Sequence, residues 1–157
     1  MAGIDEVGRG CIAGPLLAAA FSIQDNKEFD WTPLVKDSKV LTPKRRSLLS
    51  HYLRRKQFRF GIGIVSHIEI DTLGMTLATQ LAMTRSIGLP NPGPDFLLID
   101  AVDLSKTGIP CKALIKGDAT CFSIAAASII AKVARDNLMV KLDYLYPGYD
   151  LAQNKGY

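Results

Sequence analysis

The sequence predicts an α/β domain in which a mixed central sheet carries helices on both faces. Strand-like segments come first and helical segments are interleaved with them later, which is the pattern of a layered α/β architecture. One long helical segment is almost uncharged over its first half, as expected for a helix buried against a sheet. The 157 residues are 48% hydrophobic and 22% charged, which fits one globular domain with a sizeable core.

The first half of the chain is expected to hold three strands and two helices. The predicted strands are residues 1–6, 12–23 and 58–65, and the predicted helices are residues 43–55 and 68–87. The first two strands are largely apolar and flank a glycine-rich turn, which is typical of a hairpin. Thr42 before Pro43 is the sequence of a helix N-cap followed by proline at the first helical position. The third strand alternates around glycines, and the second helix carries apolar residues at helical spacing.

The second half is expected to hold two short strands and one long helix. Pro90 to Pro94 break the chain before them. The predicted strands are residues 96–99 and 111–115, and the helix covers residues 120 to about 143. Almost no charge precedes Lys132 in this helix, so it is predicted to be central and buried. No internal repeat or linker divides the chain, and residues 1–157 therefore read as a single domain.

Composition favours a polyanionic partner and excludes several kinds of site. Lys and Arg exceed Asp and Glu by 19 − 15 = 4, and the pI is about 9.0. The three cysteines have no C-x-x-C spacing and read as reduced thiols, and only two histidines are present, so zinc or histidine chemistry is not expected. No apolar run reaches membrane-spanning length, and no leader is recognisable. We therefore expect a cytoplasmic monomer without membrane contact.

Two adjacent carboxylates, Asp5 and Glu6, follow a short apolar run and precede the Gly8-Arg9-Gly10 turn. Neighbouring ionised acids repel each other, and a divalent cation would offset that repulsion. The glycines allow backbone N–H groups to approach a ligand closely, and the guanidinium of Arg9 suits phosphate. The alternative is that the acids lie on a solvated turn and that the glycines mark only a tight loop.

Two further acids lie where they could join this pair. Asp100 ends a predicted strand, and ligands of open α/β sheets collect at the carboxyl ends of strands. Asp118 precedes the long helix, where the alternative role is that of an N-cap. Asp136 falls in the charged half of that helix, where a solvated or ion-paired role is expected. A set of carboxylates without histidine or cysteine suits Mg²⁺ or Mn²⁺, and a pair of such ions serves phosphodiester cleavage.

Several motifs, in order along nearly the whole chain, resemble those of ribonuclease HII, the type 2 ribonuclease H family, and its bacterial branch in particular. They are Gly3-Ile-Asp-Glu-Val-Gly-Arg-Gly10 with Ala13-Gly-Pro15, Lys36-Asp-Ser-Lys39 with Leu41, Ala78-Thr79 with Leu81-Ala-Met83, Lys116-Gly-Asp118, Ser123–Val133 with Arg135-Asp136, Tyr146-Pro-Gly-Tyr149, and Lys155-Gly-Tyr157.

The resemblance implies an RNase H-like fold with Mg²⁺ or Mn²⁺ held by four acids, which fall here on Asp5, Glu6, Asp100 and Asp118. This favours metal binding by Asp118, although capping is compatible with it. The implied activity is hydrolysis of the phosphodiester on the 5′ side of a ribonucleotide in duplex DNA or an RNA–DNA hybrid, which leaves a 3′-hydroxyl and a 5′-phosphate.

The resemblance also implies how the substrate is bound. The turn Gly8-Arg9-Gly10 would read the 2′-hydroxyl at the RNA-to-DNA junction, largely through its backbone. Tyr157 would pack against the adjoining deoxyribose, and Lys39 would help to hold phosphates. The alternative for the basic residues, Lys36, Lys39, Lys44, Arg45 and Arg46, is a merely solvated face, and for Tyr157 a surface position.

The chain departs from the family pattern at several places. Cys11 stands where proline is usual, and Asn154 stands where histidine is usual. Gly74 replaces an asparagine, so one polar contact near the substrate is expected to be missing. Family members usually continue into a C-terminal helical segment that helps to grip the duplex, and we expect residues 1–157 to be a catalytic domain without it.

Two other functions remain open at this stage. One is a nucleic-acid-binding module of the same fold with weak or no cleavage, which metal-independent binding without cleavage would indicate. The other is a different metal-dependent nuclease or integrase on this fold, because a fold does not fix a function. Dependence of cleavage on a 2′-hydroxyl separates that class from a type 2 ribonuclease H.

Overall fold

The protein is built on one five-stranded mixed sheet. A computed structural model describes residues 1–23, 29–88, 93–153 and 155. The strands are β1 Ala2–Val7, β2 Leu16–Ile23, β3 Phe58–Val65, β4 Leu97–Asp100 and β5 Cys111–Leu114, and their order in the sheet is β3-β2-β1-β4-β5. The β1 strand pairs antiparallel with β2 and parallel with β4. Strand pairing is therefore antiparallel on one side of β1, the central strand, and parallel on the other.

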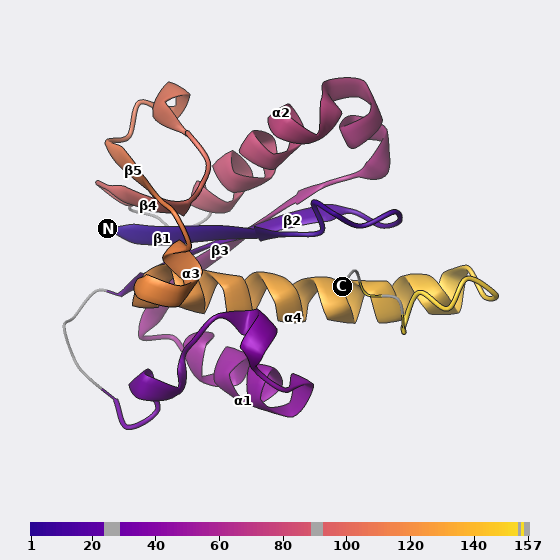
Figure 1. Cartoon of the computed structure of the whole chain (residues 1–157), viewed down its shortest axis with the longest axis horizontal. Coiled ribbons are helices and arrows are strands. Elements are labelled where there is room, and N and C mark those ends of the chain that lie inside the picture. The colour runs from indigo at the N-terminus through magenta and orange to yellow at the C-terminus, as the bar shows by residue number, and fades with distance from the viewer. Residues whose placement is uncertain (24–28, 89–92, 154, 156–157) are drawn as a thin grey trace.

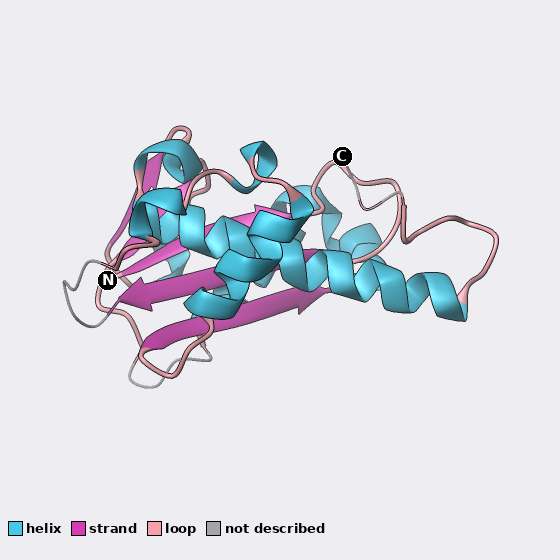
Figure 2. Ribbon diagram, turned by 90° about the horizontal axis from the view of Figure 1, so that it is seen from below, coloured by secondary structure: helices cyan, strands magenta, loops and turns pink. Residues whose placement is uncertain are grey.

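Helices cover both faces of the sheet, as predicted (Figure 1). They are α1 Pro43–Leu53, α2 His67–Ile87, the single turn α3 Gly117–Thr120, and α4 Phe122–Leu145. Among the described residues, 3₁₀ turns lie between β2 and α1, at η1 Thr32–Leu34 and η2 Ser38–Val40, and between β4 and β5, at η3 Ser105–Thr107. The α2 helix lies on one face, while α1 and α4 lie on the other, where Figure 2 shows them crossing the strands. Within the described parts of the chain, no helix is long and apolar enough to cross a membrane.

Both faces of β2 are buried from Leu16 to Phe21, which explains the uninterrupted apolar sequence of these residues. Ala18 and Ala20 pack in the core under α2, whereas Ala19 and Phe21 pack in the core under α1 and α4. Successive side chains of a strand point to opposite faces, so a strand covered on both sides must be apolar throughout. The helices that cover it leave no polar face at the centre of the sheet.

Several predicted elements are confirmed within a few residues. The β3 strand has the predicted bounds, and Thr42 caps α1 by accepting a hydrogen bond from the backbone N–H of Arg45 at 3.4 Å. Pro43 occupies the first turn of that helix. The predicted chain break at residues 90–94 lies partly outside the described residues.

One local prediction is wrong, and the alternative role of Asp118 as a helix cap is not observed. The β2 strand begins at Leu16 and not at residue 12, because residues 8–15 form a turn in which Gly8 and Gly14 take φ values of 102° and 87°. Asp118 does not cap the long helix; it lies inside α3, and the extended residue Cys121 separates α3 from α4. The apolar residues before Leu16 and the acid before the long helix are local features of the sequence. They do not reveal the backbone turns that interrupt these two segments.

Two glycines let the helices lie directly on the sheet. A Cβ atom at Gly3 of β1 would stand 2.2 Å from the backbone carbon of Ser123 in α4. On the opposite face, a Cβ atom at Gly63 of β3 would stand 1.9 Å from the carbonyl oxygen of Ala82 in α2. Backbone atoms cannot rotate out of the way, so both contacts require glycine.

We expect Gly63→Ala to destabilise the protein by about 2–4 kcal/mol, because the added methyl must push α2 off the sheet. The measurement is urea unfolding followed by circular dichroism. The control is Gly88→Ala, because φ there is −71° and the nearest atom to an added Cβ lies at 3.8 Å. Equal stability of the two variants would show that the close approach of α2 is not required.

Candidate active site

The parallel pair β1 and β4 brings two of the predicted acids together. Ile4 of β1 is in register with Ile99 of β4, and each is followed directly by an aspartate, Asp5 or Asp100. Neighbouring parallel strands carry equivalent residues side by side, so the two carboxylates lie next to each other near the carboxyl ends of these strands. Only 5% of Asp5 is exposed.

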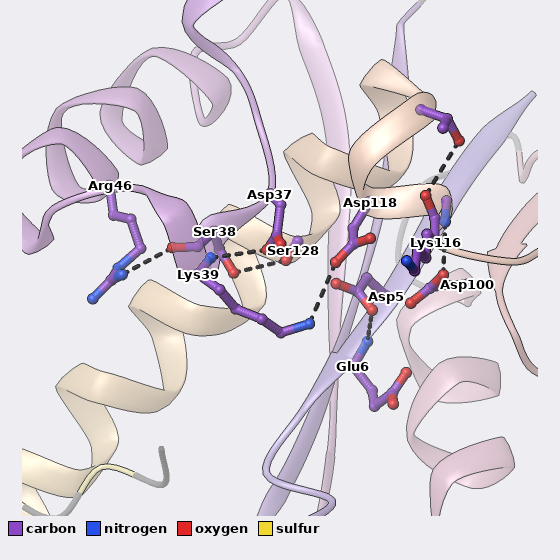
Figure 3. Close-up of polar contacts among 12 residues, drawn as sticks. Asp5, Glu6, Asp37, Ser38, Lys39, Arg46, Asp100, Lys116, Asp118 and Ser128 are labelled. Atoms are coloured by element: carbon purple, nitrogen blue, oxygen red, sulfur yellow. Dashed lines mark hydrogen bonds and ion pairs between the residues drawn. The ribbon is translucent and has the colours of Figure 1, made fainter.

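The loop after β5 adds Asp118. The backbone N–H of Gly117 donates a hydrogen bond of 2.8 Å to Oδ1 of Asp100, which ties α3 to the end of β4. Ala101 and Lys116, beside these acids, have φ values of 51° and 54°, a conformation that costs non-glycine residues energy. In Figure 3, Asp5, Asp100 and Asp118 point toward one another, and Glu6 points away from them.

Lys39 approaches the acids from η2. Its Nζ lies 3.4 Å from Oδ2 of Asp118, and 62% of the lysine side chain is exposed. Burial lowers the pKa of Lys39, but the carboxylates of Asp118 and Asp37 raise it above its usual value overall. The ammonium group is thus a positive charge beside a buried carboxylate, and its open side remains available to a ligand.

These residues surround one open pocket of about 220 Å³. Its lining residues are Asp5, Glu6, Val7, Gly8, Arg9, Gly10, Cys11, Ser38, Lys39, Asp100 and Ser128. A Cβ atom at Gly10 would meet nothing within 4 Å, so its backbone is open to close approach. Gly8 is constrained differently, since a Cβ there would stand 2.7 Å from Nε of Arg135.

The buried side chain of Arg135 holds the glycine turn from below. It donates hydrogen bonds to the carbonyl oxygens of Ala13 and Pro15, at 2.9 and 3.1 Å, and to that of Lys155. Charge-assisted bonds to three carbonyl groups satisfy the buried guanidinium. The turn is therefore fixed to α4 and to the backbone of Lys155.

The site concentrates negative charge in a poorly solvated place. Burial and the neighbouring Glu6 carboxylate raise the pKa of Asp5 to about 7, against a hydrogen bond from Ser128 that lowers it. Burial also raises the pKa values of Glu6 and Asp100. The positive charges of Arg9 and Lys39 lower the pKa of Glu6 but do not outweigh its burial.

The donor set fits a hard divalent cation. All four predicted ligands offer carboxylate oxygens, and Oε2 of Glu6 is buried without a hydrogen-bond partner. As the side chains stand, no group of three or more His, Cys, Asp or Glu residues within the described ranges is arranged to hold a metal ion. The pocket has the charge and the chemistry for a cation, and the side chains would have to close around it.

Comparison with known proteins settles the family. The family model described as ribonuclease HII matches residues 2–157. A curated ribonuclease HII from Dehalococcoides mccartyi is 48% identical over 157 residues, which is 100% of this chain and 74% of that relative. The chain belongs to the ribonuclease HII family. As a member of this family it is a hydrolytic nuclease.

Solved structures agree with this assignment. The crystal structure of ribonuclease H2 from Pyrococcus horikoshii superposes with a TM-score of 0.79 at 33% identity and covers 92% of this chain and 76% of that one. Bst-RNase HIII, solved in complex with Mn²⁺, gives a TM-score of 0.70 at 20% identity and covers 92% of this chain and 54% of that one. The latter likeness shows the fold alone. The predicted RNase H-like fold is confirmed.

Most of the predicted site residues meet in this ribonuclease HII pocket. Asp5, Glu6, Gly8, Arg9, Gly10, Lys39 and Asp100 line it, and Asp118 joins them through its ion pair with Lys39. Tyr157 and the departure Asn154 lie outside the described residues. Cys11 lines the pocket, while Gly74 has a φ of 74° and interrupts α2 with a kink.

Sequence reasoning did not single out three residues that line this pocket or lie beside it. Ser38 and Ser128 share a buried hydrogen bond of 2.8 Å, and Ser128 also bonds Asp5. Arg46 is not part of a solvated face, because it is 7% exposed and donates hydrogen bonds to backbone carbonyl groups. One signal for a buried Arg46 was available in the sequence. This charged residue lies on the face of α1 that otherwise buries Leu49 and Leu53.

The pH dependence of stability tests the crowding of acids. Because the pKa of Asp5 is about 7 in the folded protein against 3.8 ordinarily, ionising it costs folding free energy. In EDTA we therefore expect the free energy of unfolding to fall between about pH 4 and pH 7 in the wild type, and to fall less in Asp5→Asn. The measurement is urea unfolding at several pH values.

Mn²⁺ should reverse this loss. It should raise the melting temperature of the wild type more at about pH 7.5 than at about pH 5, since only ionised carboxylates bind it well. The free energy of unfolding in EDTA is compared between the wild type and Asp5→Asn at about pH 5 and about pH 7.5. A difference of the same size at both pH values would contradict the predicted burial of charge.

Proposed function

We propose that this ribonuclease HII hydrolyses the phosphodiester on the 5′ side of a ribonucleotide in a DNA duplex or an RNA–DNA hybrid, leaving a 3′-hydroxyl and a 5′-phosphate. The observation that carries the proposal is the convergence of Asp5, Asp100 and Asp118 beside an open pocket edged by a glycine turn. Membership of the family supports the substrate class. The cellular role would be ribonucleotide excision and removal of hybrids, in the cytoplasm and as a monomer.

Two divalent ions, Mg²⁺ or Mn²⁺, are the proposed cofactors, and Asp5, Glu6, Asp100 and Asp118 are the residues that would hold them. The chemistry that such a pair supplies when bound is stabilisation of the attacking and leaving oxygens of a phosphodiester. The orphaned oxygen of Glu6 and the raised pKa of Asp5 support this assignment.

The chain's own residues would bind and orient the duplex. The backbone around Gly10 is free of neighbouring atoms and could lie against a ribose, where a 2′-hydroxyl can donate to a carbonyl or accept from an N–H. Arg9 and Lys39 line the same pocket and suit the phosphates on either side. Tyr157 is proposed to pack on the adjoining deoxyribose.

The deciding experiment uses a DNA duplex with one internal ribonucleotide and an all-DNA duplex of the same sequence. Each is incubated with the protein in Mg²⁺, Mn²⁺ or EDTA, and the products are mapped at nucleotide resolution. A metal-dependent cut on the 5′ side of the ribonucleotide alone supports the proposal. Binding without any cleavage would favour the alternative of a nucleic-acid-binding module, and cleavage of both duplexes would favour another nuclease class.

Replacing Asp5 or Asp100 with Asn should abolish cleavage while the fold is retained, because each change removes charge from the proposed metal site. Circular dichroism checks the fold, and single-turnover cleavage checks activity. Asp71→Asn is the matched control, because Asp71 is an exposed acid on α2 outside the pocket. Full activity of either site variant would rule out the assigned roles.

Duplex binding should weaken as salt rises, since Lys and Arg side chains would displace counterions from phosphates. Between about 50 and 200 mM salt we expect the affinity to fall by about tenfold or more. Fluorescence anisotropy in Ca²⁺ or EDTA measures it without cleavage. Lys39→Ala should reduce the slope of log affinity against log salt by about one unit; affinity that does not change with salt would contradict a duplex substrate.

A further inference from the structure

The segment that carries Lys39 is held in place by a buried arginine. The turn η2 lies between Asp37 and Leu41, and the side chain of Asp37 accepts a hydrogen bond from the backbone N–H of Lys39 at 2.9 Å. Nη1 of Arg46, in α1, donates to the carbonyl oxygens of Ser38 and Leu41 at 2.9 and 2.8 Å. One guanidinium nitrogen thus joins both ends of the turn, as Figure 3 shows for Ser38.

The other side of this guanidinium is held by α4. Nη2 of Arg46 lies 4.0 Å from Oδ2 of Asp136, whose Oδ1 lies 2.7 Å from Nζ of Lys132. Only 7% of Arg46 and 1% of Lys132 are exposed, so the charges are largely shielded from solvent. The ion-paired role expected for Asp136 is confirmed, and the acid orients Arg46 between α1 and α4.

The anchored turn reaches the acids by two routes. Through the first, the Ser38 hydroxyl is hydrogen-bonded to Ser128, which bonds Asp5. Through the second, Nζ of Lys39 lies 3.4 Å from Asp118. Because most of the Lys39 side chain is in solvent, packing does not fix its position, and the backbone of the turn must do so.

We propose that Arg46 is a positioning residue, which acts through Lys39 on the acid cluster. The guanidinium donors of Arg46 fix the backbone of η2, and the ammonium group of Lys39 then lies beside Asp118. The contact geometry does not depend on the function proposed above; the Mn²⁺-binding and cleavage readouts rest on that function. Arg46 itself has no contact with the pocket lining other than Ser38 among the hydrogen bonds and ion pairs of the described residues.

The first test needs neither metal nor substrate. In Arg46→Lys, which keeps the charge but not the fork, amide hydrogen exchange of residues 37–41 should quicken by about tenfold or more. The control is Arg85→Lys, because Arg85 likewise binds a carbonyl, that of Ile64, and a carboxylate, that of Glu69, on the opposite face of the sheet. Unchanged exchange of residues 37–41 in Arg46→Lys overturns the proposal, whatever the activity.

The second test separates positioning from general damage. Lys39→Ala removes a positive charge beside Asp118 and should tighten Mn²⁺ binding by about threefold to tenfold. Arg46→Lys should tighten it in the same direction by about twofold or more, and should add no further tightening in the Lys39→Ala background. Both variants should cleave the ribonucleotide-containing duplex more slowly, again without additive effects. Disorder of the site as a whole would instead weaken Mn²⁺ binding.

Two further outcomes are distinguishable. Additive effects of the Arg46 and Lys39 variants on Mn²⁺ binding would refute the coupling while leaving the proposed function intact. Faster exchange in Arg46→Lys, together with a wild type that cleaves nothing, would uphold the anchoring of the turn and refute the proposed function. If Arg46→Lys does not fold, Asp136→Asn takes its place, since it releases Arg46 from one side, and the same shifts are expected with smaller size.

Discussion

The contact between α4 and β1 is the constraint on which the rest of the site depends. Gly3 allows the two backbones to meet, and α4 then passes under the end of β1 with four polar residues along one side. They are Ser128, Lys132, Arg135 and Asp136, spaced so that they fall on neighbouring positions of the helix surface. Ser128 bonds Asp5, Arg135 holds the glycine turn, and Asp136 orients Arg46. One helix thus supports both the glycine turn and, through Arg46, the turn that carries Lys39.

This arrangement sets stability against function. Buried carboxylates at the ends of β1 and β4 cost folding free energy when they ionise, and left-handed backbone at Ala101 and Lys116 adds strain beside them. The apolar layers on the two faces of the sheet offset these costs. A cluster of buried acids that is unfavourable by itself is the pattern expected where sequence rules are broken for function.

Sequence reasoning found the elements whose signals are local and missed those that depend on distant contacts. The bounds of β3 and the capping of α1 follow from alternation and from Thr42 with Pro43. The start of β2 does not, because Ile12 is apolar yet fully exposed in the turn. The spacing of the acids left their role open, and the resemblance of the motifs to those of a known family predicted that role. No local pattern could have paired Arg46 with Asp136, because that contact exists only after α1 and α4 have packed.

The hydrogen bonds around the pocket join residues far apart along the chain. Ser38 and Ser128 are 90 positions apart, and Arg135 reaches back 122 positions to Ala13. Neither contact can form before the later residue of each pair is part of the chain. On a ribosome, β1 with Asp5 and Glu6 would leave the exit tunnel long before α4. A nascent chain would therefore carry acids of the site without assembling them, and nuclease chemistry would begin only once the whole domain had closed.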